Sequence, residues 1–239
     1  MKIALVGYGK MGKEIEKISL ERGHEIVLII DRDNHNNFTK ENIQKADIVI
    51  EFSTPDTAYD NYIKCIEAQV PVVSGTTGWL DKREALEDYC KLNKSGFFYA
   101  SNFSLGVNLF FELNKKLASM MNNFSDYDVE MKEIHHIHKL DAPSGTAITL
   151  AEGIIDNIEN KKAWELDDAS KSYNLKIVAK REGEVPGTHI IKYASDVDEI
   201  EIAHRAYSRK GFALGAVVAA EFMKGKSGVY GMKELLKNL

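Results

Sequence analysis

The sequence predicts an α/β protein in which a doubly wound parallel sheet is followed by an α+β domain with a mixed sheet. Two observations support this prediction. Up to about residue 125, short apolar runs of strand character alternate with segments of helical periodicity, which is typical of parallel strands joined by helices. Beyond that point, several strand-like runs follow one another without regular helices between them, which favours antiparallel or mixed pairing.

The alternation in the first part of the chain defines its expected elements. Strand-like runs cover residues 2–6, 25–30, 47–52, 70–73 and 97–100. Helical periodicity covers residues 12–22, 57–69, 82–92 and 107–121. Because helices fill most of the gaps between the strands, parallel strands with crossover helices are the expected arrangement.

The second part of the chain has a different organisation. Strand-like runs lie at residues 127–135, 175–180, 189–194 and 199–206, and one clear helix begins near Ser144. The tail is helical again at residues 211–223 and 232–236, and we expect it to return to the first domain. The expected domains are therefore residues 1–105 with 210–239, and residues 106–209.

Composition excludes several classes of protein. The 239 residues carry a formal net charge of −5, which disfavours a broad surface for nucleic-acid phosphates. Two cysteines are too few for a disulfide framework and favour a reducing compartment. The apolar stretch 212–223 is too short to cross a bilayer, and no charged leader precedes the first strand. We expect a cytoplasmic protein with neither a nucleic-acid nor a membrane partner.

The first predicted strand runs directly into a glycine-rich loop. Residues 7–12, Gly-Tyr-Gly-Lys-Met-Gly, fit the pattern G-x-G-x-x-G and open the first predicted helix. Glycines at these positions allow a tight turn and a close approach of the backbone to a pyrophosphate, and the helix N-terminus supplies amide donors. We therefore expect a Rossmann-like sheet that binds a dinucleotide. The expected contacts are Gly7, Tyr8, Gly9, Lys10, Met11 and Gly12.

Asp31 and Arg32 lie at the end of the second predicted strand, where the adenosine end of a dinucleotide is expected. Asp31 follows Gly12 by nineteen positions, and its carboxylate suits the ribose hydroxyls of NAD. The guanidinium of Arg32 suits the 2′-phosphate of NADP, although a solvated surface arginine explains this residue equally well. NADH, NADPH or both therefore remain open as cofactors.

Two further loops follow predicted strands and are expected to line a nicotinamide pocket. In open α/β sheets, ligands lie outside the carboxyl ends of the strands. The residues concerned are Gly75, Thr76 and Thr77, and Ala100, Ser101, Asn102 and Phe103. Each loop taken singly is also explained as an ordinary turn.

A dense group of ionisable residues is the strongest indication of chemistry. Residues 133–146 read Glu-Ile-His-His-Ile-His-Lys-Leu-Asp-Ala-Pro-Ser-Gly-Thr. Imidazoles titrate near neutral pH, and a spacing of four places His135 and Lys139 on one face of any regular segment, so the two are candidates for proton transfer. His136 and His138 share the other face if the segment is extended. We expect no metal, because no Cys or carboxylate completes a recognised ligand spacing. A solvated histidine run is the other alternative.

A turn and a helix follow the histidines. Asp141 is a candidate N-cap, and Pro143 suits the first helical turn because its missing N–H costs nothing there. The amides of Gly145 and Thr146 would then face an incoming anion at the positive end of the helix. The whole segment therefore favours proton transfer to a bound anion.

The segment 133–147 resembles the signature of the 4-hydroxy-tetrahydrodipicolinate reductase family, formerly called dihydrodipicolinate reductase. The resemblance spans nearly the whole chain. Its other motifs, in order, are the loop 7–12, Gly75-Thr-Thr-Gly78, Ser101-Asn-Phe-Ser-Leu-Gly106, Gly187-Thr-His189, Ile202-Ala-His-Arg-Ala206 and Phe212-Ala-Leu-Gly-Ala216. Glu51 stands where many members carry Asp.

The resemblance implies an NAD(P)H-dependent reduction of 4-hydroxy-tetrahydrodipicolinate, a small cyclic dicarboxylate, to tetrahydrodipicolinate with loss of water. This step belongs to lysine and diaminopimelate biosynthesis. By position, the resemblance implies that His135 is the acid/base catalyst and Lys139 the proton donor, and that His136, Gly145 and Thr146 bind substrate carboxylates. It also implies that residues 1–105 and 210–239 bind the cofactor, whereas residues 106–209 bind substrate and build a homotetramer through their sheet. No role follows for His138.

Three other functions stay open. A regulator that senses NAD(H) would keep the glycine-rich loop but would have no need for His135, Lys139 or the anion-binding turn. A metal-dependent hydrolase would lose activity on chelation. Another dehydrogenase, acting on a different dicarboxylate, is the closest rival.

Overall fold

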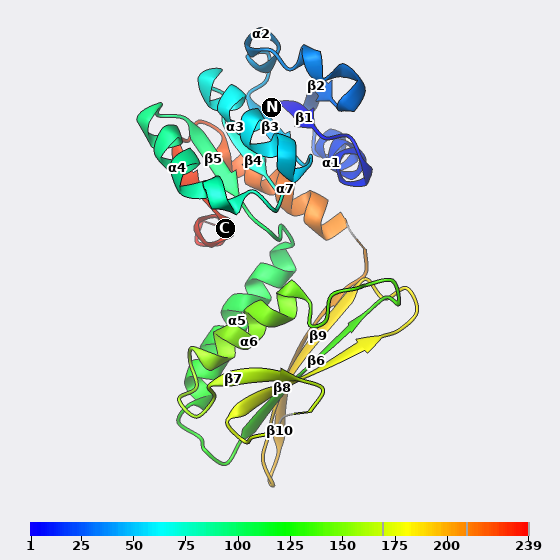
Figure 1. Ribbon diagram of the computed structural model, residues 1–239, viewed down its shortest axis with the longest axis vertical. Coiled ribbons are helices and arrows are strands. Elements are labelled where there is room, and N and C mark those ends of the chain that lie inside the picture. The colour runs from blue at the N-terminus through cyan, green and yellow to red at the C-terminus, as the bar shows by residue number, and fades with distance from the viewer. Residues whose placement is uncertain (169, 209, 239) are drawn as a thin grey trace. The chain divides into compact units, whose positions relative to one another are not determined.

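The computed structural model describes residues 1–168, 170–208 and 210–238. The chain divides into two units (Figure 1). Unit 1 consists of Met1–Leu105 and Lys210–Leu239, and unit 2 of Gly106–Arg209. The last residue expected for the second domain, 209, and the last residue of the chain, 239, lie outside the described residues. The helical tail belongs to unit 1, and the functions expected of the two domains stay predictions.

Unit 1 is built on a six-stranded parallel sheet with the order β11-β5-β4-β3-β1-β2. The chain runs outward from β1 to β2 and then continues on the other side of β1, so the strand order reverses between β1 and β3. The strands are β1 Lys2–Val6, β2 Glu25–Ile30, β3 Ile48–Glu51, β4 Val72–Ser74, β5 Gly96–Tyr99 and β11 Gly228–Tyr230. This arrangement confirms the predicted doubly wound, Rossmann-like sheet. The edge strand β11 was not among the expected elements.

Helices cover both faces of this sheet, as Figure 1 shows for α1 and α7 and for α3 and α4. Alternate residues of each strand point to opposite faces, so Ala4 packs with α3 and α4 while Leu5 packs with α1 and α7. The helices of this unit are α1 Lys10–Glu21, α2 Lys40–Ile43, α3 Pro55–Glu67, α4 Arg83–Leu92, α7 Lys210–Met223 and α8 Met232–Leu236, and short 3-10 helices cover η1 Arg32–Asn37 and η2 Leu80–Lys82.

Small residues bring α7 close to the sheet. Ala213, Ala216 and Ala220 are fully buried in the core that α7 shares with α1. At Gly215 the approach is closest, because a Cβ built there would lie 1.7 Å from the carbonyl oxygen of Phe103. The loop after β5 is therefore fixed against α7 by backbone contact that only glycine allows.

Unit 2 is a five-stranded mixed sheet with the order β10-β9-β6-β8-β7. Its central strand β6 pairs antiparallel with β9 and parallel with β8, which confirms the predicted mixed sheet. The strands are β6 Asp128–His135, β7 Ala163–Leu166, β8 Asn174–Arg181, β9 Gly187–Ala194 and β10 Glu199–Ala206, and the helices are α5 Leu105–Met121 and α6 Gly145–Ile155. The short strand β7 was not expected from the sequence.

The helices α5 and α6 lie over one face of this sheet (Figure 1). Val129 and Met131 of β6 point to that face and pack in the same core as Leu150 of α6. By the alternation of a strand, the next two inward positions are Glu133 and His135, and both are buried. The ionisable side chains of Glu133 and His135 thus follow two apolar side chains on the covered face of β6. No helix in the described ranges is both long and apolar enough to cross a bilayer.

The contact between α7 and the loop after β5 yields a testable expectation. Gly215→Ala should destabilise the protein by roughly 1–3 kcal/mol, because the added methyl group overlaps the Phe103 carbonyl and forces the helix away. Melting temperatures of the purified variants measure the effect. Gly211→Ala on the same helix is the matched control, since its Cβ would meet only Ser104 Oγ at 3.8 Å. Equal melting temperatures for the two variants would contradict the packing argument.

Candidate active site

A pocket of about 570 Å³ lies at the carboxyl ends of β1, β2 and β3 in unit 1. It spans the point where the strand order reverses, which is where open α/β sheets bind nucleotides. Of the expected cofactor residues, those that line it are Gly7, Tyr8, Gly9, Asp31 and Arg32. The structure therefore brings the glycine-rich loop and the end of β2 together around one cavity.

Different physical constraints explain why glycine stands at each of the positions 7, 9 and 12 of the G-x-G-x-x-G loop. Gly7 has a φ of +88°, and a Cβ there would lie 2.0 Å from the carbonyl oxygen of Phe52. A Cβ at Gly12 would lie 2.3 Å from the Gly7 carbonyl oxygen, whereas Gly9 has nothing within 4 Å. Gly9 is also the N-cap of α1 and provides no capping side chain. The open space at Gly9 and the uncapped start of α1 suit an anionic pyrophosphate.

Asp31 and Arg32 lie exposed at the far side of the same pocket. The Asp31 carboxylate accepts a hydrogen bond from the Arg32 amide at 2.9 Å, and the Asp31 amide donates to Asn34 Oδ1 at 2.7 Å. This capping box fixes the first turn of η1. His35 and Asn61, which were not expected from the sequence, also line the pocket. His35 Nε2 lies 3.2 Å from Asn61 Oδ1.

The remaining expected cofactor residues do not line this pocket. Thr76 is buried, and its hydroxyl accepts from the Ser53 amide at 2.9 Å and contacts Glu51 Oε1 at 3.2 Å. Phe103 packs its ring on Phe52 and Phe98 in the core. The expected residues outside the pocket lining are Lys10, Met11, Gly12, Gly75, Thr76, Thr77, Ala100, Ser101, Asn102 and Phe103. Thr76 and Phe103 thus have structural contacts that explain them without a ligand.

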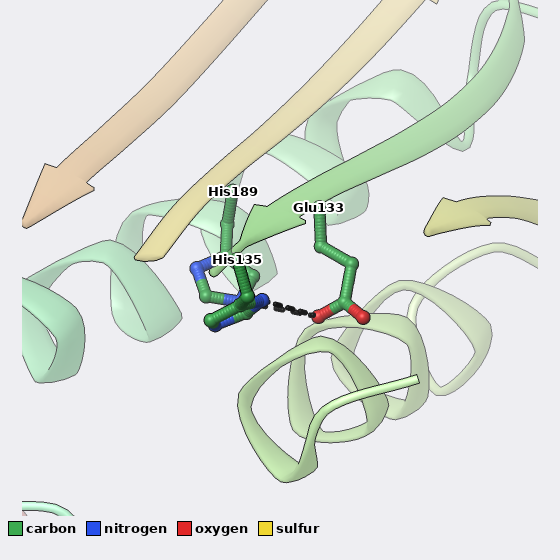
Figure 2. A group of neighbouring side chains, drawn as sticks. All are labelled: Glu133, His135 and His189. Carbon is green, nitrogen blue, oxygen red and sulfur yellow. Dashed lines mark ion pairs between the residues drawn. The ribbon is translucent and has the colours of Figure 1, made fainter. Parts of the chain in front are cut away.

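The second group of functional side chains lies in unit 2, around a buried carboxylate. Glu133 is 0% exposed, and its Oε2 lies 3.3 Å from Nδ1 of His135 and 3.7 Å from Nε2 of His189 (Figure 2). Glu133 and His189 are register partners on the antiparallel strands β6 and β9. The sheet therefore places two imidazoles and one carboxylate in contact on its covered face.

Two further groups contact the same carboxylate. Nη2 of Arg181, at the end of β8, donates to Glu133 Oε1 at 3.2 Å. The Ser144 amide donates to the two carboxylate oxygens at 3.1 Å and 3.2 Å. Neither Glu133, Arg181 nor Ser144 was a candidate site residue from the sequence, and His189 was noted only within a motif. The available signal was the inward alternation along β6, which puts Glu133 in the same row as His135.

The helix α6 begins at Gly145, near the expected start, but its cap lies three positions after the expected one. Ser144 is its N-cap, and the Ser144 hydroxyl accepts from the Ala147 amide at 3.2 Å. The expectations that Asp141 caps the helix and that Pro143 lies in its first turn were therefore wrong, because the serine hydroxyl reaches the first-turn amides instead. Gly145 and Thr146 are the first two helical residues, as an anion-binding helix start requires.

The segment between β6 and α6 is a turn and not a continued strand or helix. β6 ends at His135, and the Lys139 amide donates to the His136 carbonyl at 3.1 Å. Their alignment on one face was expected only for a regular segment, and the turn does not meet that condition. Among the described residues, no hydrogen bond or ion pair joins His135 to Lys139 directly. Lys139 Nζ instead pairs with the Asp141 carboxylate oxygens at 2.8 Å and 2.9 Å.

Arg181 holds this turn from the side of the sheet. Its Nε donates to the Lys139 carbonyl at 3.3 Å, and its Nη2 donates to the Asp141 carbonyl at 2.6 Å. The same guanidinium contacts Glu133. One arginine thus connects the buried carboxylate with the backbone on both sides of Leu140.

The three histidines of the run have different environments. His135 is buried, His136 is half-buried and His138 is exposed. His138 Nε2 lies 3.3 Å from Glu184 Oε1, an exposed pair to which we give no role. A uniformly solvated histidine run is therefore not what the chain forms.

Burial and charge act against one another in the cluster. Burial raises the pKa of Glu133, but contacts with His135, His189 and Ser144 outweigh it and hold that pKa below its ordinary range. Burial lowers the pKa of His189, and the charge of His135 adds to this effect while Glu133 opposes it. The hydrogen bond from Lys139 lowers the pKa of Asp141. Glu133 and Asp141 are accordingly carboxylates near neutral pH, and His189 favours the neutral ring.

The cluster also has the composition of a possible metal site. Ligand-type atoms of Glu133, His135 and His189 all lie within 4.8 Å of one another. The sequence argument against a metal overlooked Glu133, which is a carboxylate two positions from His135. The contacts with the Arg181 guanidinium and the Ser144 amide occupy that carboxylate, and a guanidinium 3.2 Å away disfavours a second cation. We interpret the group as a charge cluster.

The lowered pKa of His189 gives a prediction for stability. Because folding lowers this pKa from about 6.5 in the unfolded chain, the unfolded state binds more protons, and stability is lost as the pH falls below that value. The melting temperature should therefore decrease as the pH is lowered from 8 to 5. His189→Asn should make the melting temperature less dependent on pH. His138→Asn, at an exposed position, serves as the control. Parallel curves for wild type and His189→Asn would contradict the expectation.

Comparison with known families identifies both units. A family model described as dihydrodipicolinate reductase, N-terminus, matches residues 1–103, and one described as its C-terminus matches residues 106–236. A 4-hydroxy-tetrahydrodipicolinate reductase of Christiangramia forsetii is 53% identical over 239 residues, which cover 100% of this chain and 99% of the relative. One of Thermosipho africanus is 36% identical over 240 residues, which cover 99% and 98%.

Solved structures share the fold. The dipicolinate-bound dihydrodipicolinate reductase from Paenisporosarcina sp. TG-14 has a TM-score of 0.79 at 24% identity and covers 98% of each chain. A probable dehydrogenase from Thermotoga maritima has a TM-score of 0.56 at 11% identity, covering 98% of this chain and 92% of that one. At these identities the likeness speaks for the architecture alone. The two family models and the full-length relatives carry the further conclusion that the chain belongs to the dihydrodipicolinate reductase family.

Proposed function

We propose that the protein reduces 4-hydroxy-tetrahydrodipicolinate to tetrahydrodipicolinate, with loss of water and at the expense of NADH or NADPH, in lysine and diaminopimelate biosynthesis. An oxidoreductase activity accords with relatives of this name along the full chain. The observation that carries the chemistry is the position of His135 and Lys139 at the two ends of one short turn that leads directly into the start of α6.

The start of α6 is proposed to bind a substrate carboxylate. Ser144 caps the amide of Ala147, and the amides of Gly145 and Thr146 precede it at the positive end of the helix. Gly145 has nothing within 4 Å of its Cβ position, so a ligand can approach the backbone closely. His136 is proposed to bind a carboxylate as well. The Paenisporosarcina relative was solved with dipicolinate, a planar cyclic dicarboxylate, which supports this class of ligand.

Lys139 and His135 are proposed to handle the proton that the reduction requires. The hydroxyl group of the substrate leaves with a ring proton as water, which gives an unsaturated ring. The nicotinamide, when bound, supplies the hydride to this ring, and the electron-rich product then takes a proton from Lys139 with help from His135. The Asp141 carboxylate holds the Lys139 side chain in place through an ion pair at 2.8 Å. Donation requires that the ammonium turn from Asp141 to the substrate.

The 570 Å³ pocket is the proposed dinucleotide site. The loop Gly7, Tyr8 and Gly9 would hold the pyrophosphate, and Asp31 and Arg32 would meet the adenosine end. Asp31 favours the free ribose of NADH, whereas Arg32 favours the 2′-phosphate of NADPH, so we propose that both cofactors are used. Lys10, Met11 and Gly12 contribute the first turn of α1, and the loops at Gly75 to Thr77 and Ala100 to Phe103 are proposed to face the nicotinamide.

We extend the proposal to assembly and location. The face of the mixed sheet that α5 and α6 leave uncovered carries mixed charges, among them the pair Lys192 and Glu130, whose Nζ and Oε1 atoms lie 3.0 Å apart. A homotetramer built through this face, working in the cytoplasm, completes the proposed protein. The direct test of function is an absorbance assay with freshly made 4-hydroxy-tetrahydrodipicolinate and each cofactor. Absence of turnover with both cofactors, or loss of activity on chelation, would favour the other functions.

Lys139→Ala tests the proton donor. Turnover should fall at least a hundredfold because the turn then lacks the proposed proton donor, while the affinity for cofactor stays within about twofold. Steady-state kinetics and fluorescence titration with NADPH measure the two quantities. Lys180→Ala, an exposed position on β8, is the matched control. Near-normal turnover of Lys139→Ala would remove the assignment.

Arg32→Ala tests the adenosine end. The change should weaken binding of NADPH several-fold more than that of NADH, because only NADPH has a phosphate for the guanidinium to pair with. Dissociation constants for both cofactors, measured at one ionic strength, give the ratio. Equal weakening of both would show that Arg32 has no phosphate role.

A further inference from the structure

Glu133 occupies a position where packing calls for an apolar residue. It continues the inward row of Val129 and Met131 on β6, at 0% exposure. A buried ionised carboxylate is costly unless it is paired and hydrogen-bonded. Such a group persists only if its partners compensate for the lost hydration, so the identity of those partners indicates what the carboxylate does.

The partners come from four separate parts of unit 2. Oε2 faces His135 of β6 and His189 of β9, Oε1 accepts from Arg181 of β8, and the Ser144 amide at the start of α6 donates to both oxygens. Arg181 in turn holds the carbonyls of Lys139 and Asp141. The proton-handling residues and the anion-binding helix start thus share a single carboxylate.

We propose that Glu133 is a positioning residue that orients the His135 ring for proton transfer and fixes the start of α6 relative to that ring. The inference rests on the proposed function, because it assigns roles to Glu133 within that reaction. It concerns a residue that acts through others, since Glu133 is fully covered and cannot touch a substrate.

The geometry around His135 favours one orientation of the ring. Nδ1 lies 3.3 Å from the Glu133 carboxylate, as an electrostatic contact outside hydrogen-bond geometry, and Nε2 lies on the other side of the ring. At that side lies Gly187, whose Cβ position would be 3.2 Å from Nε2. Gly187 therefore adds no side chain over Nε2, and the negative charge beside Nδ1 favours the proton on that nitrogen. This is the arrangement by which a carboxylate sets the tautomer of a catalytic histidine.

Ser144 connects the same carboxylate to the anion site. Its amide donates to Glu133, its hydroxyl caps α6, and that hydroxyl lies 3.2 Å from His189 Nε2. If Glu133 loses its charge, the constraint on Ser144 weakens, and the Gly145 and Thr146 amides lose their fixed direction. Proton transfer and dicarboxylate binding should consequently weaken together.

Glu133→Gln is the decisive variant, because it keeps the shape and removes the charge. We expect kcat to fall at least tenfold and the affinity for pyridine-2,6-dicarboxylate to fall several-fold, with NADPH affinity unchanged. Glu130→Gln, three positions earlier on β6 but exposed, should leave all three quantities unchanged. A Glu133→Gln protein with wild-type kcat and dicarboxylate affinity would overturn the proposal, as would a loss of NADPH affinity equal to the other losses, which indicates general damage.

Nitrogen-15 NMR of the imidazoles supplies a readout that does not need turnover. In the wild-type protein the neutral ring of His135, assigned through His135→Asn, should carry its proton on Nδ1, and Glu133→Gln should shift the ring toward the other tautomer. Arg181→Lys keeps the positive charge beside Glu133 but loses the two hydrogen bonds to the carbonyls of Lys139 and Asp141. It should therefore lower kcat while leaving the His135 tautomer unchanged.

The wild-type spectrum decides the matter even if Glu133→Gln does not fold. A His135 ring protonated only on Nε2 in the wild-type protein would overturn the inference. The proposed function is tested separately, by turnover of the wild-type protein with 4-hydroxy-tetrahydrodipicolinate. If that assay fails while the NMR result is as expected, the proposed reaction is wrong but the positioning of His135 by Glu133 stands.

Discussion

The free-energy cost of burying one carboxylate is the constraint around which unit 2 is arranged. Glu133 has lost its contact with water, and the groups that compensate for this loss arrive from three strands and the start of a helix. Satisfying it fixes the relative positions of β6, β8, β9 and α6 at one end of the sheet. The candidate catalytic residues lie at the same end of the sheet. The contacts that compensate for the burial of Glu133 therefore also fix the geometry of the candidate site.

A comparable constraint operates in unit 1 with different chemistry. Glu51 is also fully buried, but hydroxyl groups surround it, with Ser74 Oγ at 2.8 Å and Thr76 Oγ1 at 3.2 Å. The Ser53 amide donates to it at 3.0 Å. These contacts tie the loop after β3 to the loop after β4. The Glu51 side chain reaches both loops from the end of its strand.

Periodicity in the sequence was sufficient for the architecture but not for every element. Runs such as Lys2–Val6 and Glu25–Ile30 were predicted at their observed bounds because continuous apolar runs are typical of parallel strands buried on both faces. The strands β7 and β11 were missed, because Glu165 interrupts the apolar residues of β7 and β11 has only two apolar residues after a glycine. Among site residues, local spacing predicted the glycine-rich loop and His135. It could not predict Glu133, His189, Arg181 and Ser144 as a group, because only strand register brings them together.

The position of α7 in the chain has a consequence for how the protein is made. Unit 1 takes its last helices and its edge strand from Lys210–Leu239, after the whole of unit 2. During synthesis, residues 1–105 leave the ribosome with the apolar face that Ala213, Ala216 and Val217 later cover still exposed to solvent. At ordinary translation rates that exposure lasts for several seconds. Until its own C-terminus arrives, the nascent sheet therefore exposes an apolar surface to which other chains can bind.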